Sequence, residues 1–308
     1  EDTVRQCIWI GTEGYLFQYF PSTGQMKQTE AFHNNSIKSL ALDGNGDLLA
    51  GTDNGLYVYH NDTTPLQHII HDSRNIQSLT NNIIWNIFAD QEHNIWLGTD
   101  YGISLSRYNS ALQFIPISQI TGTGDGNQFY SLFRDSKGFY WFGGTNGLIR
   151  FTDPAGERHD TIWYRMGDKT YPLSHNRIRH IYEDKEQQLW IATDGSINRY
   201  DYATRQFIHY NIVDSTGMYN TNWTYYMFED TAGQLWISTC LGGIFVVDKH
   251  KLMQSASGQY VAEQNYSVHN GLSGMFINQI IPDNEGNVWV LLYNNKGIDK
   301  INPRTREV

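Results

Sequence analysis

The feature that most constrains this chain is a short tryptophan motif that returns along its whole length. The motif is Trp, an apolar residue, a small residue and usually Thr, as in WIGT, WLGT, WIAT and WIST. Its copies are spaced about 40 to 53 residues apart, the period of β-propeller blades with four strands each. Seven copies, two of them degenerate, begin at residues 9, 49, 96, 141, 190, 236 and 289.

Each repeat divides into the same four predicted strands. An apolar inner strand ends in Asp and a turn, the tryptophan strand follows, and a glycine turn leads to a third strand and an outer strand. Successive apolar residues just before the Asp indicate an inner strand that is buried on both faces. A composition of 14% aromatic and 18% charged residues suits many short strands. We therefore predict an all-β, seven-bladed β-propeller of four-stranded antiparallel blades.

The first repeat is incomplete, because Glu1 and Asp2 stand where the other repeats end their inner strand. We expect the first blade to lack this strand and the chain to be a fragment of a longer polypeptide. Residues 1–308 are predicted to form a single propeller domain. Its units are expected near residues 1–30, 31–70, 79–117, 127–162, 174–211, 220–256 and 274–308.

Charge and missing signatures narrow the possible functions. The chain has 22 Lys and Arg against 32 Asp and Glu, a formal net charge of −10 that repels nucleic acids. No apolar stretch is long enough to span a membrane, so we expect neither a nucleic-acid partner nor membrane contact by this segment. Metal-ligand spacings, phosphate loops and nucleophile elbows are absent from the sequence. We expect no cofactor, no metal and no catalytic residue, and unpaired cysteines at Cys7 and Cys240.

One repeat, LSHNRIRHIYEDKEQQLWIATDGSINRYDYATRQFIHY, resembles the two-component regulator propeller repeat, and the resemblance covers most of the chain. It implies the periplasmic sensor region of a Bacteroidetes hybrid two-component system histidine kinase. Such a region reports an oligosaccharide or other glycan-derived signal to a cytoplasmic kinase that is not in this chain. The implied partners are an oligosaccharide or other small ligand and the remaining domains of the same sensor, with a homodimer left open.

Positions that differ between repeats can bind a ligand without disturbing the scaffold. The fifth and seventh residues before the inner-strand Asp alternate toward one face at the entrance of the strand. A basic loop at residues 161–180 adds positive charge that an anionic ligand could use. The candidate ligand-binding residues are Lys38, Trp85, Tyr130, Arg165, Arg177, Arg179, Trp223 and Tyr225.

Two structural interpretations compete with these candidates. Large aromatic side chains also pack between blades, and the charges of a solvated loop also neutralise nearby carboxylates. The Asn that recurs eight residues before the Asp is assigned to the turn that enters each inner strand, because every blade has the same need for it. It stands at Asn35, Asn82, Asn127, Asn176 and Asn222.

Two other functions stay open at this point. The tryptophan core is similar to that of the streptogramin lyases, which are propeller enzymes, although their repeated G-R-I ending is absent here. A protein-protein interaction platform is a common role of propellers in general.

Overall fold

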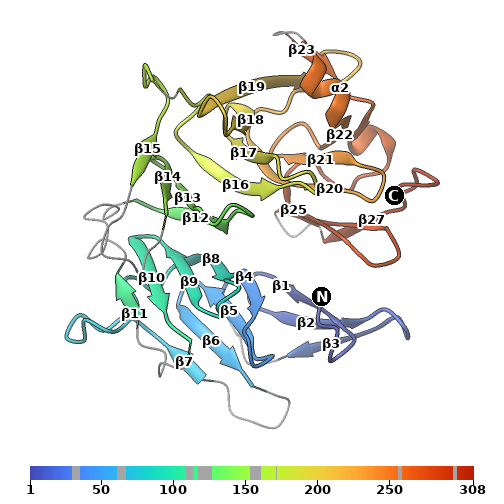
Figure 1. Ribbon diagram of the computed structural model, residues 1–308. Coiled ribbons are helices and arrows are strands. Elements are labelled where there is room, and N and C mark those ends of the chain that lie inside the picture. Colours follow the sequence, from blue (N-terminus) through green and yellow to red (C-terminus); the bar gives the residue numbers. More distant parts are fainter. Residues whose placement is uncertain are drawn as a thin grey trace. The chain divides into compact units, whose positions relative to one another are not determined.

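Short strands dominate the computed structural model, which describes residues 1–29, 35–60, 67–108, 114–116, 127–152, 161–170, 172–255, 259–293 and 297–308. Within these ranges the strands form seven separate sheets, and the neighbouring strands of a sheet pair in sequence order and in an antiparallel manner (Figure 1). One strand, β23, breaks this order and joins the edge of the fifth sheet in a parallel manner.

The first sheet contains β1 (Ile8–Gly11), β2 (Leu16–Phe20) and β3 (Gln25–Thr29), and the second contains β4 (Ile37–Leu42), β5 (Leu48–Thr52), β6 (Gly55–Tyr59) and β7 (Gln67–Ile69). The third sheet contains β8 (Ile84–Ala89), β9 (Ile95–Thr99), β10 (Gly102–Ser106) and β11 (Phe114–Pro116). The fourth contains β12 (Phe129–Arg134), β13 (Tyr140–Gly144), β14 (Gly147–Phe151) and β15 (Ile162–Tyr164).

The fifth sheet contains β16 (Ile178–Glu183), β17 (Leu189–Thr193), β18 (Ser196–Asp201), β19 (Gln206–Val213) and β23 (Gln259–Val261). The sixth contains β20 (Thr224–Glu229), β21 (Gln234–Thr239), β22 (Ile244–Asp248) and β24 (Gln264–Tyr266). The seventh contains β25 (Ile277–Pro282), β26 (Val288–Leu292) and β27 (Ile298–Ile301). Two short helices accompany these sheets, α2 (Lys249–Gln254) and the 3-10 helix η2 (Val268–Asn270).

The chain divides into two compact units. Unit 1 comprises Glu1–Arg134, Phe139–Thr145 and Arg150–Thr161, and unit 2 comprises Asp135–Gly138, Asn146–Ile149 and Ile162–Val308. The fourth sheet has strands in both. In unit 1 the inner strand β4 lies beside β8, and β8 lies beside β12. In unit 2 β16 lies beside β20, and β20 lies beside β25.

The hydrophobic core of unit 2 lies between consecutive sheets. Trp190 and Ile197 of the fifth sheet pack with Met227 and Phe245 of the sixth. Trp236 of the sixth sheet packs in the same way with residues of the seventh, including Ile280. Because the tryptophan strands are buried on both faces, side chains of each strand contribute to two layers of packing.

The small residue of the tryptophan motif is explained by close approach to the next inner strand. A Cβ atom on Gly51 would lie 2.7 Å from Cγ2 of Ile84, and one on Gly98 would lie 2.6 Å from the carbonyl oxygen of Phe129. Both distances are shorter than van der Waals contact. The motif therefore needs a small residue here so that consecutive sheets can pack.

In five of the seven repeats an Asp at the end of the inner-strand position is hydrogen-bonded to the tryptophan of the next strand. The indole Nε1 of Trp96 donates to Oδ2 of Asp90 at 2.8 Å, and that of Trp190 donates to Oδ2 of Asp184 at 2.9 Å. The same bond joins Trp236 to Asp230, Trp289 to Asp283 and Trp9 to Asp2. The bond at Asp2 shows that this residue occupies the position of the strand-end Asp in the first repeat.

The predicted turn-capping role of the recurring Asn side chain is not what the bonds show: Oδ1 of Asn82 accepts the N–H of His71 at 2.6 Å and that of Asn176 accepts the N–H of Met166 at 2.7 Å, so both side chains bond to the preceding connection. The main-chain carbonyl of this Asn accepts a hydrogen bond from a turn glycine of the preceding sheet, at 2.7 Å for both Asn82 with Gly55 and Asn176 with Gly147. The glycine N–H groups are presented by backbones with φ of 99° and 103°, which favour glycine.

Two features differ from the predicted repeat. The outer strand of the sixth unit is β24, which lies beyond the predicted limit 220–256, because α2 and β23 are inserted before it. The outer strands of the fourth and fifth units run two residues past the predicted limits 127–162 and 174–211. Inserted residues do not follow the repeat, so the repeat could not reveal them.

The insertion carries a buried lysine. The Nζ atom of Lys249 lies 2.9 Å from Oε1 of Glu229 and 3.3 Å from Oδ2 of Asp184, and its side chain is 1% exposed. Burial alone would lower the pKa of Lys249, but the ion pairs with Glu229 and Asp184 outweigh burial, so this pKa is raised. The lysine thereby neutralises carboxylates at the ends of two consecutive inner strands.

We expect Trp96→Phe to lower the free energy of unfolding by about 2 to 4 kcal/mol, because it removes a buried hydrogen bond to a carboxylate and leaves a small cavity. Urea denaturation would measure the change. Trp163→Phe is the matched control, since Trp163 is half-buried and makes a ring contact with Arg165 instead of a bond to a strand-end Asp. Equal effects of the two substitutions would contradict the role of the Asp–Trp bond.

We expect Lys249→Met to lower the free energy of unfolding by about 3 to 5 kcal/mol at pH 7, because two buried carboxylates lose their cation. A raised lysine pKa stabilises the fold below the unfolded pKa and ceases to do so as the pH rises through the folded pKa. The free energy of unfolding of the wild type should therefore fall only in strongly alkaline solution, where Lys249 loses its proton. The variant has no lysine to deprotonate here, so its stability should not show this fall. Lys251→Met, whose side chain is 66% exposed, should change stability little; a small effect of Lys249→Met would contradict the ion-pair network.

Candidate functional site

The variable position of the repeat is a β-bulge in all six inner strands of the described residues. In each one the pairing register with the tryptophan strand shifts by one residue at the same place. The extra residue has no residue opposite it in the register of the ladder, and a bulge redirects its side chain. These bulge residues are the predicted variable set, and all are half-buried: Lys38, Trp85, Tyr130, Arg179, Tyr225 and Asn278.

A second variable row lies beside the bulges. The residue after each tryptophan strand donates its N–H to the carbonyl of the residue seven before the Asp, as from Asp100 to Ile83 at 2.9 Å. This row was not predicted from the sequence, although the residue that follows the recurrent Thr changes from repeat to repeat. Its members are Asp53, Asp100, Thr145, Asp194, Cys240 and Tyr293.

Unit 1 brings three predicted residues together. The ammonium of Lys38 lies 4.5 Å from the centre of a Trp85 ring, a cation–π distance. The rings of Trp85 and Tyr130 meet edge to face, with centroids 5.3 Å apart and planes at 82°. The indole Nε1 of Trp85 donates to Oδ1 of Asp100 at 3.0 Å.

Gln128 connects the polar atoms of this group. Its Nε2 donates to Oδ1 of Asp100 at 2.6 Å, and its Oε1 accepts from the hydroxyl of Tyr130 at 2.6 Å. We call Lys38, Trp85, Asp100, Gln128 and Tyr130 the unit 1 cluster. It combines one cation, one carboxylate and two aromatic rings in fixed orientations.

Unit 2 brings four predicted residues together around Asp194. Arg179 donates from Nε to Oδ1 of Asp194 at 2.8 Å and from Nη2 to Oδ2 at 3.4 Å. Its guanidinium lies 4.6 Å from the ring centre of Tyr225. Arg177 reaches Asp194 with Nη1 at 3.6 Å from Oδ2, and its side chain remains 44% exposed. The main-chain N–H of Trp223 donates to the carbonyl of Asp194 at 3.0 Å.

The unit 2 cluster is therefore Arg177, Arg179, Asp194, Trp223 and Tyr225. Burial raises the pKa of Tyr225 to about 12, even though Arg179 opposes the shift. Burial also raises the pKa of the neighbouring Cys240 thiol, which is free of any disulfide. Both groups stay protonated at neutral pH and can donate hydrogen bonds.

Arg165 contacts different residues from Arg177 and Arg179. Its guanidinium is 4.5 Å from the ring centre of Trp163, and its Nε donates to the carbonyl of Asn146 at 3.3 Å. His180 of the same predicted basic loop lies on β16 and stacks on Tyr226 at 3.8 Å. Burial lowers the pKa of His180 to about 3, so its ring is neutral. The loop therefore divides its basic residues among different partners.

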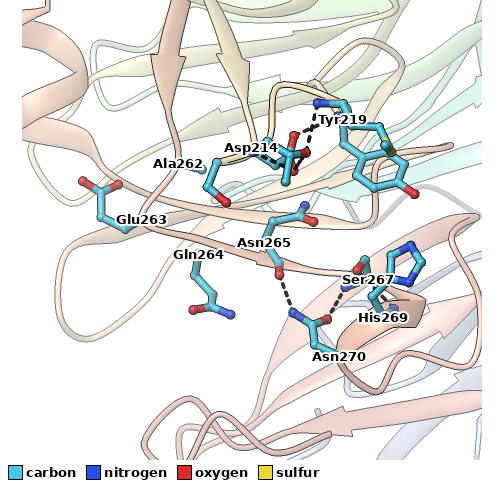
Figure 2. Close-up of a pocket in the computed structure, with 12 residues that line it drawn as sticks. Asp214, Tyr219, Ala262, Glu263, Gln264, Asn265, Ser267, His269 and Asn270 are labelled. Carbon is cyan, nitrogen blue, oxygen red and sulfur yellow. Dashed lines mark hydrogen bonds between the residues drawn. The ribbon is translucent and has the colours of Figure 1, made fainter.

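A separate pocket of about 480 Å³ lies in unit 2, where the connection from β19 to β20 faces β24 and η2 (Figure 2). Asp214 accepts hydrogen bonds from Thr216 and from the N–H of Tyr219, and these bonds hold its pKa low against the opposing effect of burial. Asn270 bridges Ser267 and Asn265 (Figure 2). Much of this polar lining is occupied by bonds within the loops themselves.

Two further observations concern the described residues as a whole. They contain no group of three or more His, Cys, Asp or Glu side chains placed to hold a metal ion. None of the helices found in them has the length and apolar character that crossing a membrane requires.

Comparison with solved structures places the chain in an extracellular region. It is 97% identical, over its full length, to the extracellular domain of the putative hybrid two component system BT4673 from B. thetaiotaomicron, with a TM-score of 0.61. It is 19% identical to the extracellular domain of the putative hybrid two component system BT3049 from the same organism, covering 97% of this chain and 39% of that one, with a TM-score of 0.73. The predicted extracellular, periplasmic location is confirmed.

A curated relative is also a longer protein. The chain is 27% identical over 234 residues to histidine kinase P4 from Formosa agariphila, which covers 68% of this chain and 16% of that protein. The chain thus spans 41% of the solved BT4673 domain and a smaller share of the kinase.

The predicted fold class is confirmed by more distant structures. The WD40 β-propeller domain of Doa1 aligns with 98% of the chain at 10% identity, with a TM-score of 0.68. A streptogramin B lyase aligns with 97% at 14% identity and a TM-score of 0.66, a likeness of fold alone. The chain is an all-β, seven-bladed propeller whose first and last sheets have three strands in the described residues.

The family assignment rests on the repeats themselves. The family model described as "Two component regulator propeller" matches residues 78–101, 123–146 and 172–195. These segments run from the entrance of an inner strand to the turn after the tryptophan strand, so they contain both the recurring Asp and Trp of the repeat and the bulge. The chain belongs to the two component regulator propeller family.

Proposed function

We propose that this propeller is a ligand-sensing part of a hybrid two-component sensor and that its ligand is an oligosaccharide or another glycan-derived molecule. The near identity to an extracellular domain of such a system supports the sensing role. Kinase activity would reside in other domains of the same polypeptide. The remaining domains and a second copy of the chain are the partners through which ligand binding would be relayed.

The observation that carries the proposal is the bulge in each inner strand. A bulge lets one side chain per blade vary without changing the ladder around it. The two clusters at these bulges combine flat aromatic rings with fixed hydrogen-bonding groups, as in Trp85 with Asp100 and Tyr225 with Arg179. A sugar ring offers an apolar face and several hydroxyl groups, so it matches both kinds of group.

The electrostatic arrangement favours recognition by hydrogen bonds over attraction of a strong anion. Asp194 takes up two donors of Arg179 and lies near Arg177, which leaves a small net positive charge in the unit 2 cluster. The unit 1 cluster has one positive and one negative side chain. Paired charges of this kind orient their partners and provide directional donors and acceptors.

We expect at least one saccharide to bind the purified protein saturably in a panel of neutral and acidic oligosaccharides, and to raise its melting temperature. Calorimetry and thermal shift measure the two effects. Trp85→Ala should weaken binding at least tenfold, or about 1.4 kcal/mol, because it removes the ring that contacts Lys38 and Tyr130.

The matched control is Trp163→Ala, which removes a half-buried ring on the outer strand β15 and should leave affinity unchanged. Unchanged affinity in Trp85→Ala would contradict the placement of the site in the unit 1 cluster. A panel in which nothing binds would contradict glycan sensing and favour a protein-interaction platform.

A further inference from the structure

Trp223 adopts a backbone conformation that is unfavourable for its residue type. Its φ is 56°, in the left-handed region where a bulky L-residue is an outlier. The residues at the same repeat position in the other inner-strand entrances, such as Arg177 and Phe276, are not among the positive-φ residues of the described chain. The conformation is therefore particular to this one blade and not a requirement of the repeat.

Two main-chain bonds hold Trp223 in this conformation. Its N–H donates to the carbonyl of Asp194 at 3.0 Å, and its carbonyl accepts from the N–H of Cys240 at 3.0 Å. The residue thereby links the tryptophan-strand ends of the fifth and sixth sheets. Strained conformations persist where the surrounding structure over-determines them, and they concentrate at ligand-binding sites.

The side chain gains little from its position in the unbound protein. It is 48% exposed, and its indole has no hydrogen bond or ring contact within the described residues. Each of the other eight tryptophans has such a contact: Trp9, Trp85, Trp96, Trp141, Trp163, Trp190, Trp236 and Trp289. Trp223 therefore combines an unfavourable backbone with an indole that has no partner.

The residues linked to Trp223 combine apolar and polar groups. Leu241, which is 53% exposed, follows Cys240, whose N–H donates to the carbonyl of Trp223, and the ring of Tyr225, two residues along the strand, lies 6.0 Å from that of Tyr293. Arg177, 44% exposed, is joined to Trp223 through the backbone of Asp194, which donates to the carbonyl of Arg177 and accepts from the N–H of Trp223. Only Nη1 of Arg177 is paired with Asp194, so its other N–H groups can meet the hydroxyl oxygens of a sugar while the sugar ring offers an apolar face to the indole.

We propose that Trp223 is the stacking platform of a saccharide subsite in unit 2, where it packs against the apolar face of an uncharged pyranose ring. The free N–H groups of Arg177 donate to hydroxyl oxygens of the same ring. This inference rests on the proposed glycan-sensing function and adds to it the residue that holds the ring. The left-handed backbone conformation of Trp223 holds the indole exposed at the proposed binding site.

The test is Trp223→Asn, because Asn tolerates the left-handed region and removes the indole. The matched control is Arg205→Asn, since Arg205 is also exposed, has a φ of 59° and lies in the turn between β18 and β19. Both variants should melt at the wild-type temperature or above it. Only Trp223→Asn should weaken binding, at least tenfold by calorimetry, to a neutral oligosaccharide that the wild type binds.

A second measurement follows the indole directly. The same oligosaccharide should shield wild-type tryptophan fluorescence from quenching by acrylamide, and this shielding should be smaller in Trp223→Asn at saturating ligand, because the Trp223 indole no longer contributes to it. An affinity within twofold of the wild type would overturn the inference while leaving glycan sensing intact. A large fall in melting temperature in Trp223→Asn alone would assign the residue to the scaffold and overturn the inference as well. If no oligosaccharide binds the wild type, the proposed function and this inference are both contradicted.

Discussion

The hydrogen bond between the strand-end Asp and the tryptophan of the next strand is the interaction on which the repeat depends. In the fifth sheet, Oδ1 of Asp184 accepts the N–H groups of Glu186 and Gln188 in the turn, while Oδ2 accepts the indole N–H of Trp190. One carboxylate thus fixes the end of the inner strand, the turn and the largest core side chain. Because the bond is buried and involves a charged acceptor, its loss costs more than that of an exposed bond.

This arrangement assigns different tasks to the two ends of each inner strand. The bulge lies five residues before the Asp, which corresponds to about 15 Å along a strand. At the Asp end, sequence variation would break the turn and the indole bond. At the bulge end, the residue has no opposite partner in the pairing register, so its side chain is not constrained by the neighbouring strand. Residues as different as Lys38, Tyr130 and Arg179 therefore occupy equivalent places. Recognition can therefore diversify between blades without loss of the fold.

The repeated interactions could be predicted from the sequence because they recur with the same residue types. Trp, Asp and the small residue of the motif predicted the seven sheets, the three strands of the first sheet and the variable positions. The pairing of Arg179 with Asp194 could not be predicted, because it joins two variable positions that the repeat treats as independent. The parallel strand β23 was missed for a similar reason, since it is inserted within the sixth repeat and pairs with the fifth sheet.

The second oxygen of the strand-end Asp also contacts a group from the following sheet. The hydroxyl of Tyr140 lies 3.5 Å from Oδ2 of Asp90, the hydroxyl of Tyr202 donates to Oδ2 of Asp135 at 2.6 Å, and Lys249 reaches Asp184. Burial and the bond to Asp135 both raise the pKa of Tyr202, so its hydroxyl stays a donor. Three different donors from three different places in their repeats meet the same need. An acceptor that recurs in every repeat can thus hold consecutive sheets together while its donors change, and these donors have no sequence signature of their own.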